Sequence, residues 1–313
     1  MTESASAQPR ESLPLDSTAQ LLTRITAQLG TQLSHVSLNG TRRPPMHRTI
    51  RPAPGTATAP VLVAVAHGSR DPQALRTVVK LLDRVRELRP GLDVRLGHIE
   101  LNEPLLPSTL TGLGSGDAVL VPLLLGRGHH VKHDIPAAAA AAPALRTTIA
   151  APLGPHPLLV EALYGRLLEA GWPTEEAASG SSAVVLAAAG SRDPDSAADT
   201  RRTARMLSER LGGVPVVPAY ASAADPTVSA ATRALAARGR HRIAVASYFT
   251  APGRFATAAA AATPGIAAAP LGAHPAVARL ILHRYDRALA DQARSGAREA
   301  HESAVNGALL ASA

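Results

Sequence analysis

A segment of twelve residues occurs twice in the chain, and its two copies restrict the folds open to the sequence. It reads VLVAVAHGSRDP at 61–72 and AVVLAAAGSRDP at 183–194. The small apolar residues of each copy predict a buried strand, and the Gly-Ser-Arg-Asp-Pro that follows predicts a turn into a helix that Ser69 can cap. His67 of the first copy corresponds to Ala189 of the second. The repeat therefore predicts two related units that differ by one imidazole.

Strands and helices are expected to alternate along both units. The predicted strands are short runs rich in small and branched apolar residues, at 61–66, 93–101, 118–125 and 147–151 in the first unit and at 183–188, 215–220 and 242–248 in the second. This alternation is typical of parallel sheets made from right-handed βαβ units. We therefore predict an α/β fold with two similar lobes related by internal repeat, each a four-stranded parallel sheet flanked by helices.

Changes in composition divide the chain into five parts. Residues 1–57 carry Ser, Thr, Gln and Pro without sustained apolar alternation, which predicts a disordered N-terminal extension. The lobes are expected at 58–170 and 183–290, with a polar linker at 171–182. Residues 291–313 are expected to form a flexible tail.

Composition excludes several classes of function. The chain has no cysteine, which rules out disulfides, zinc held by cysteine and cysteine-ligated iron–sulfur clusters, and fits a cytoplasmic location. No apolar run is long enough to cross a membrane, and the N-terminal residues do not show the charged-then-apolar order that is typical of a signal peptide. The net charge of +8 comes from scattered arginines, and aromatics make up 2% of the chain, so nucleic acid is a disfavoured partner.

Comparison of the two lobes separates residues that serve the fold from residues that serve chemistry. His156 and His274 match and each precedes a helix, so both are expected to be helix-start residues. Three positions lose a metal-ligating side chain in the second lobe: His67 corresponds to Ala189, Glu100 to Ser222, and His130 to Phe255.

The three lost side chains all lie at the carboxyl ends of predicted strands of the first lobe. In a flavodoxin-like strand order, 2-1-3-4, the first and third strands are neighbours and the ligand site lies between them. If that order is assumed, His67 and His130 meet across the crevice, and Glu100 stands at its rim. Two imidazoles and a carboxylate suit divalent iron, nickel, copper or zinc and leave coordination positions open.

Other polar residues cluster near the same sheet edge. His129 and His133 are equally consistent with additional metal ligands and with a solvated loop. Arg70, Arg127 and Lys132 are candidates for binding carboxylate groups of a substrate, although Arg70 is matched in the second lobe, which favours a structural role for it.

Three motifs in order, HGSRDP, IELNEP and PLLLGRGHHVKHDIP, resemble the sirohydrochlorin chelatase family over roughly residues 60–290, in its long two-lobe form. These class II chelatases insert cobalt, iron or nickel into sirohydrochlorin on the way to sirohaem, cobalamin or a nickel tetrapyrrole. The resemblance implies that His67 and His130 bind the metal and that Glu100 is a catalytic base or further ligand. It also implies one site per chain, because the second lobe departs from the pattern at all three positions.

The resemblance further implies which molecules the protein meets. The partners are sirohydrochlorin, a polycarboxylate, and a divalent metal (Co²⁺, Fe²⁺ or Ni²⁺) that is a substrate, with no permanently bound cofactor. A monomer is expected because two lobes substitute for a dimer. Two alternatives stay open: a tetrapyrrole or metal carrier without turnover, and a structural or regulatory pseudo-enzyme. Glu100 beside the histidines favours turnover, because a carrier needs no base.

Overall fold

A computed structural model describes residues 59–173, 180–263 and 265–311, with side chains described up to residue 298. The expected N-terminal extension, 1–57, lies outside the described residues, as does half of the expected linker, residues 174–179. Residues from 57 onward form one compact unit, which contains both lobes.

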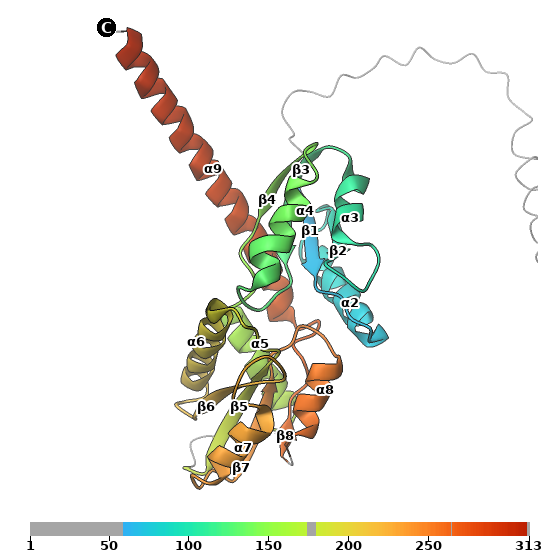
Figure 1. Ribbon diagram of the computed structural model, residues 1–313, viewed down its shortest axis with the longest axis vertical. Coiled ribbons are helices and arrows are strands. Elements are labelled where there is room, and N and C mark those ends of the chain that lie inside the picture. The colour runs from blue at the N-terminus through green and yellow to red at the C-terminus, as the bar shows by residue number, and fades with distance from the viewer. Residues whose placement is uncertain (1–58, 174–179, 264, 312–313) are drawn as a thin grey trace, which may run out of the picture. The chain divides into compact units, whose positions relative to one another are not determined.

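The described chain contains two four-stranded parallel sheets, as predicted (Figure 1). The strand orders are β2-β1-β3-β4 and β6-β5-β7-β8, so the order assumed from the sequence is confirmed. The strands are β1 (Val61–Ala66), β2 (Val94–His98), β3 (Gly116–Pro122), β4 (Leu145–Ile149), β5 (Ser182–Ala188), β6 (Val216–Tyr220), β7 (Arg242–Ser247) and β8 (Ile266–Ala267). The central strands β1 and β5 consist of small apolar residues because helices cover both faces of each sheet.

The repeated turn starts helices α2 and α6 in the same way. Asp71 and Asp193 are the N-caps, and each carboxylate accepts the backbone N–H two residues later. Ser69 was expected to cap the first of these helices, but its hydroxyl instead accepts the N–H of Asp71. The serine shapes the turn and the aspartate caps the helix, because the Asp side chain stands at the position whose oxygen reaches the first free N–H groups.

Helices alternate with the strands along the chain. They are α2 (Pro72–Leu88), α3 (Leu106–Leu113), the single π-helical turn η1 (His130–Asp134), α4 (Ile135–Ala140), α5 (Pro157–Glu169), α6 (Pro194–Arg210), α7 (Val228–Ala236), α8 (Arg254–Ala261) and α9 (Pro275–Ala311). Helices α3 and α4 cover one face of the first sheet, and α7 and α8 cover the corresponding face of the second. The remaining two faces belong to a single apolar core that both lobes share.

The two lobes exchange their last helices across this shared core. Helix α5 ends the first repeat in sequence, yet it packs against α6 and β7 of the second lobe. Helix α9 ends the second repeat and packs against α2, β3 and β4 of the first lobe. Tyr285 of α9 is buried, and its hydroxyl donates to the carbonyl of Pro60 at 2.6 Å. The lobes expected at 58–170 and 183–290 are therefore units of sequence, whereas each packed lobe borrows one helix from the other.

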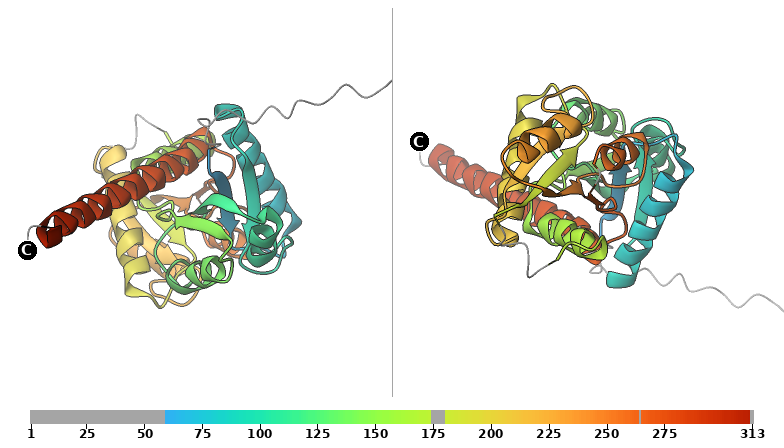
Figure 2. Two further views of the ribbon diagram at one scale, coloured as in Figure 1. Left: turned by 90° about the horizontal axis from the view of Figure 1, so that it is seen from above. Right: turned by 90° about the horizontal axis from the view of Figure 1, so that it is seen from below.

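The C-terminal segment differs from the expected flexible tail. Helix α9 continues without a break from Pro275 to Ala311 (Figure 2). Residues 291–311 contain no proline and six alanines, and alanine favours the helical state more than any other residue. Although α9 is 37 residues long, neither it nor any other helix of the described chain is long and apolar enough to cross a membrane.

Candidate active site

The ends of β1 and β2 are joined by backbone contacts that place His67 beside Glu100. The N–H of Glu100 donates to the carbonyl of His67 at 3.0 Å. Gly68 has a φ of +103°, and a Cβ there would overlap the carbonyl oxygen of Glu100. Only glycine permits this close approach at a positive φ. The result is a distance of 3.6 Å between Nδ1 of His67 and a carboxylate oxygen of Glu100.

His130 reaches the same place from the neighbouring strand. It follows β3 by a loop and begins η1, a kind of turn that is frequent at functional sites. Its ring lies 4.8 Å from the ring of His67, edge to face. Its Nδ1 lies 2.6 Å from Oδ2 of Asp134. The structure thus brings together His67, Glu100 and His130 as the sequence predicted, and adds Asp134.

Each imidazole has a carboxylate near its Nδ1 atom: Glu100 lies near Nδ1 of His67, and Asp134 lies near Nδ1 of His130. A hydrogen bond from Nδ1–H to Asp134 leaves the Nε2 lone pair of His130 free for a metal. Nδ1 of His67 lies 3.2 Å from the carbonyl oxygen of Gly68, its hydrogen-bond partner, and Glu100 stands 3.6 Å away, where its carboxylate can accept a proton. Among the described residues, no group of three or more His, Cys, Asp or Glu side chains already stands in metal-holding geometry. A metal here would take the two imidazoles and waters, unless Glu100 turns toward it.

The second lobe repeats the backbone of this site without its side chains. The N–H of Ser222 donates to the carbonyl of Ala189 at 2.9 Å, as Glu100 does to His67. Gly190 has a φ of +91°, and its added Cβ would overlap the carbonyl oxygen of Ser222. Phe255 stands two residues after Gly253, as His130 does after Gly128. The backbone geometry thus serves the fold, and the imidazoles are additions to it.

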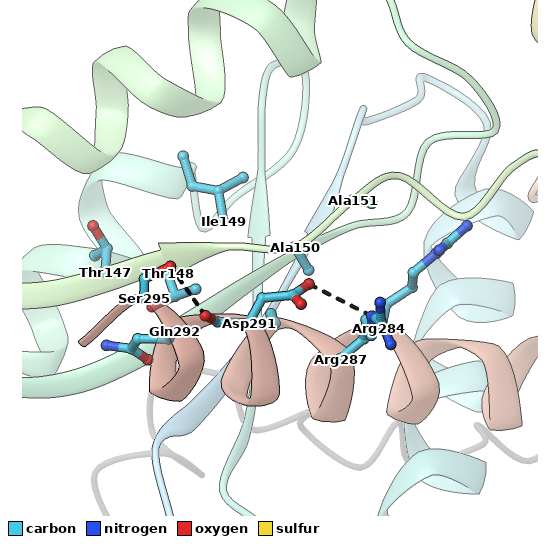
Figure 3. A pocket seen from close by; sticks show the side chains of 11 residues that line it. Thr147, Thr148, Ile149, Ala150, Ala151, Arg284, Arg287, Asp291, Gln292 and Ser295 are labelled. Carbon is cyan, nitrogen blue, oxygen red and sulfur yellow. Dashed lines mark hydrogen bonds and ion pairs between the residues drawn. The ribbon is translucent and has the colours of Figure 1, made fainter. Parts of the chain in front are cut away.

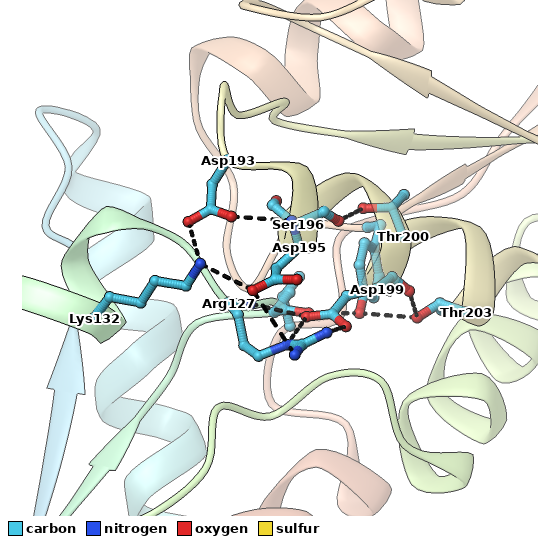
Figure 4. A network of polar contacts seen from close by, with 10 residues as sticks. Arg127, Lys132, Asp193, Asp195, Ser196, Asp199, Thr200 and Thr203 are labelled. Carbon is cyan, nitrogen blue, oxygen red and sulfur yellow. Dashed lines mark hydrogen bonds and ion pairs between the residues drawn. The ribbon is translucent and has the colours of Figure 1, made fainter.

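Arg127 and Lys132 do not point to an open substrate site, in contrast to the sequence expectation (Figure 4). The guanidinium of Arg127 donates to both carboxylate oxygens of Asp199 at 2.8–3.0 Å, and its backbone N–H donates to the same side chain. The ammonium of Lys132 lies 2.7 Å from Asp193 and 2.9 Å from Asp195. Both cations are engaged by the second lobe, because carboxylates at the start of α6 face them.

These ion pairs shift the ionisation of the carboxylates involved. Burial alone raises the pKa of Asp199, but the side-chain and backbone hydrogen bonds from Arg127 outweigh it, and the net pKa lies below the usual value. A hydrogen bond from Lys132 likewise lowers the pKa of Asp193. Both carboxylates are therefore ionised at neutral pH.

Arg70 differs from the other two predicted cations. It is exposed beside His67 and makes no hydrogen bond or ion pair with the described residues. It therefore stays available to a ligand, and no contact of its side chain with the described residues supports the structural role that its match in the second lobe favoured.

His129 and His133 lie side by side, with ring centroids 4.7 Å apart. Together with Ser191, Arg192 and Asp193 of the second lobe they line an open cavity of about 560 Å³. The guanidinium of Arg192 in this lining favours an anion over a bare cation. Its counterpart in the first lobe is Arg70, so both repeats carry an arginine at this turn.

His156 and His274 are helix-start residues, as predicted. Nδ1 of His156 accepts the N–H of Leu158 at 3.1 Å, and Nδ1 of His274 accepts the N–H of Ala276 at 3.2 Å. Each imidazole is the N-cap of a helix that the lobes exchange. Both histidines serve the fold, which explains why both repeats keep them.

A second cavity, of about 420 Å³, lies between β4 and α9 (Figure 3). Its lining includes Thr147, Thr148, Arg284, Arg287 and Asp291, and none of the predicted site residues. The imidazole pair therefore marks the better candidate for chemistry.

Sequence reasoning missed the carboxylates that support the site. Asp134 lies four residues after His130, a spacing that brings two side chains to one face of a helical turn, so the signal was present. The other carboxylates belong to the second lobe and lie more than 60 residues beyond Arg127 and Lys132 in the sequence: Asp193, Asp195 and Asp199. Only the packing of the two lobes brings them to the loop that carries His130.

The fold and this edge define a class: tandem α/β proteins that pair two imidazoles at the carboxyl ends of one parallel sheet. The chain belongs to the CbiX family, which it matches over residues 61–170 and 183–288. A solved structure of SirB from Bacillus subtilis with Fe³⁺ covers 74% of this chain and 96% of its own, with a TM-score of 0.60 and 24% identity. A CbiX described as the terminal enzyme of sirohaem biosynthesis in denitrifying bacteria covers 73% and 99%, with a TM-score of 0.54 and 21% identity. These likenesses establish the fold.

Relatives of known activity match part of the chain. The sirohydrochlorin ferrochelatase of Bacillus subtilis (strain 168) is 30% identical over 172 residues, which are 53% of this chain and 64% of the relative. The sirohydrochlorin cobaltochelatase of Priestia megaterium is 27% identical over 193 residues, or 59% and 62%. The chain thus spans less than two thirds of the length of these relatives. The resemblance to sirohydrochlorin chelatases is confirmed at the level of the family.

Proposed function

We propose that this protein inserts Fe²⁺ or Co²⁺ into sirohydrochlorin. The observation that carries the proposal is the pair of imidazoles, His67 and His130, at 4.8 Å on the ligand-binding edge of the first sheet, each with a carboxylate on its Nδ1 side. Membership of the CbiX family supports it, and so do the names of the relatives, which specify ferrochelatases and cobaltochelatases.

In the proposed reaction a divalent ion replaces two pyrrole N–H protons, so two protons leave for each metal inserted. Neutral His67 and His130 hold the ion through Nε2 and release it to the ring nitrogens. Glu100 is half exposed and lies next to His67, where it can take a proton from the ring and pass it to solvent. Two protein ligands suit a substrate metal, because a closed set of four would retain it.

Asp134 has a separate role in this proposal. Its carboxylate fixes the ring of His130 and the position of the Nδ1 proton, which keeps Nε2 directed at the metal. Such an outer partner also raises the basicity of the ligating nitrogen. The polycarboxylate substrate would meet Arg70 beside His67 and Arg192 in the neighbouring cavity.

The experiment is anaerobic incubation of the protein with sirohydrochlorin and Co²⁺ or Fe²⁺ while the tetrapyrrole absorption spectrum is recorded. We expect the spectrum of the metallated ring to appear faster than in the uncatalysed reaction, over many turnovers. A carrier would bind metal or ring without turnover, and a pseudo-enzyme would do neither. Either result would exclude the proposed activity.

A further inference from the structure

The loop that carries His130 is held at three points by the second lobe. The hydroxyl of Tyr248 donates to the carbonyl of Leu125 at 2.9 Å. Arg127 then binds Asp199, and Lys132 binds the carboxylates of Asp193 and Asp195. We call the ion pairs of Arg127 and Lys132 the loop clamp (Figure 4). Its two cations stand three residues before and two residues after His130.

Arg127 makes the stronger half of the loop clamp. The side chain of Asp199 is 5% exposed and accepts three hydrogen bonds, all from Arg127. A buried carboxylate held by two nitrogens of a guanidinium fixes direction as well as distance. One of the three donors is the backbone N–H, so the clamp fixes the main chain of the loop and not only a flexible side chain.

The loop clamp exists on one side of the molecule only. The corresponding loop of the second lobe has Pro252 where Arg127 stands and Thr257 where Lys132 stands. In α2, Thr77 takes the place of Asp199, and its hydroxyl donates within its own helix. Both lobes keep the same sheet and the same contacts between β1 and β2, or β5 and β6, so the fold does not need the clamp. Within the described chain, the loop clamp is present only at the loop that carries His130.

We propose that the second lobe positions the metal site of the first: Asp199, with Asp193 and Asp195, holds the loop so that His130 faces His67. Asp199 is thus a positioning residue that acts through Arg127. This inference rests on the proposed function only in taking His67 and His130 as the metal-binding pair. In this proposal the second lobe, which lacks the histidines, keeps the ring of His130 at 4.8 Å from the ring of His67.

The test compares Asp199→Asn with a matched control, Glu161→Gln. Glu161 of α5 pairs with Arg210 of α6 at 2.8 Å, so it also links the two repeats, but it does not touch the loop. Binding of Co²⁺ is measured by calorimetry and by the visible absorption of the bound ion, without tetrapyrrole. We expect Asp199→Asn to weaken Co²⁺ binding about tenfold or more and to change the absorption band, and Glu161→Gln to leave both unchanged.

A second variant separates positioning from stability. In Arg127→Met with Asp199→Leu, apolar side chains replace the half-exposed guanidinium and the buried carboxylate together, so neither charge is left without its partner. We expect a melting temperature near that of the wild type and Co²⁺ binding that stays weak. Wild-type Co²⁺ affinity in Asp199→Asn, or affinity restored together with stability in the double variant, would overturn the inference. If the wild type binds Co²⁺ through His67 and His130 but does not metallate sirohydrochlorin, the proposed function fails and the positioning role stands.

Discussion

At the scale of single residues, the site is defined by side chains that the fold itself does not require. His67 is nearly half exposed, and Ala189 occupies the equivalent place in the second lobe at no evident cost to the sheet. Comparison of the repeats could therefore predict His67, Glu100 and His130 from sequence. The same comparison could not predict the partners of Arg127, because an ion pair across two lobes leaves no local pattern.

We expect His67→Ala and His130→Ala each to abolish most metal insertion, by about 10³-fold or more, while the melting temperature changes little. Removal of an imidazole takes away a ligand but leaves the backbone contacts of the sheet edge in place. Metallation of sirohydrochlorin followed by absorbance, with thermal unfolding of the same samples, checks this. Near-wild-type turnover in either variant would refute the assignment.

The capping histidines predict a dependence of stability on pH. Burial, together with the charges of Arg284 and His283, lowers the pKa of His156 to about 4. Burial also lowers the pKa of His274. Each Nδ1 accepts a helix N–H, so protonation would turn this acceptor into a donor facing a donor.

An unfolded histidine titrates near 6.5, so the unfolded chain takes up these protons first as the pH falls. The contribution to stability is therefore complete above about pH 6.5 and is lost between about pH 6.5 and 4. We expect a loss of order 2 kcal/mol, reduced from the full value because the rings are partly exposed. Urea unfolding across this range checks it. In His156→Asn, which caps without titrating, the loss should be smaller, and an equal loss would contradict the assignment.

At the scale of elements, the order of strands and helices followed from alternation of apolar runs and turns in the sequence. The strand order of both sheets is the one assumed from the sequence, because short right-handed crossovers permit few strand orders. The exchange of α5 and α9 could not be foreseen, since an apolar helix face does not specify which sheet it covers. The long helical form of residues 291–311 was missed because few apolar residues mark it.

The turn after β1 provides a matched pair of variants. Gly68→Ala and Gly190→Ala both place a Cβ against a carbonyl at a positive φ, so each should destabilise the protein by about 2 kcal/mol or more. Only Gly68→Ala should also lower metal insertion in the folded protein, because it moves Glu100 relative to His67. Thermal unfolding and turnover measured below the transition separate the two effects.

Gly112→Ala is the control for this pair, because a Cβ there meets no atom and the φ is ordinary. It should leave turnover unchanged and should not lower stability, because alanine is favoured over glycine in helix α3. Equal losses of turnover in the Gly68 and Gly190 variants would contradict the placement of the site.

At the scale of the whole molecule, the two lobes are similar in backbone and unequal in chemistry. We expect calorimetric titration with Co²⁺ to give one tight site per chain, which His67→Ala removes. Introducing Ala189→His and Phe255→His into that variant should not restore insertion, because a ligand also needs partners such as Asp134 and the loop clamp. Two equivalent tight Co²⁺ sites per chain, or metal insertion restored by the two introduced histidines, would refute the prediction that only the first lobe binds the metal.

The shared core predicts that the halves depend on each other. A fragment of residues 59–173 lacks α9 and keeps only α2 on the shared-core face of its sheet, so part of that apolar face would be uncovered, and we expect it to aggregate. Coexpression with residues 180–313 should yield a soluble complex, detected by size-exclusion chromatography. A soluble, monomeric 59–173 fragment would contradict the exchange of helices.

The position of α9 also affects how the chain folds during translation. The first sheet is complete once Ile149 has left the ribosome, but helix α9, which covers one of its faces, begins at Pro275, roughly 125 residues later. At about 5–20 residues per second, the nascent lobe waits on the order of ten seconds with an apolar face open. The first lobe therefore emerges first and finishes last, and it is the part of the chain with the greatest need of a chaperone.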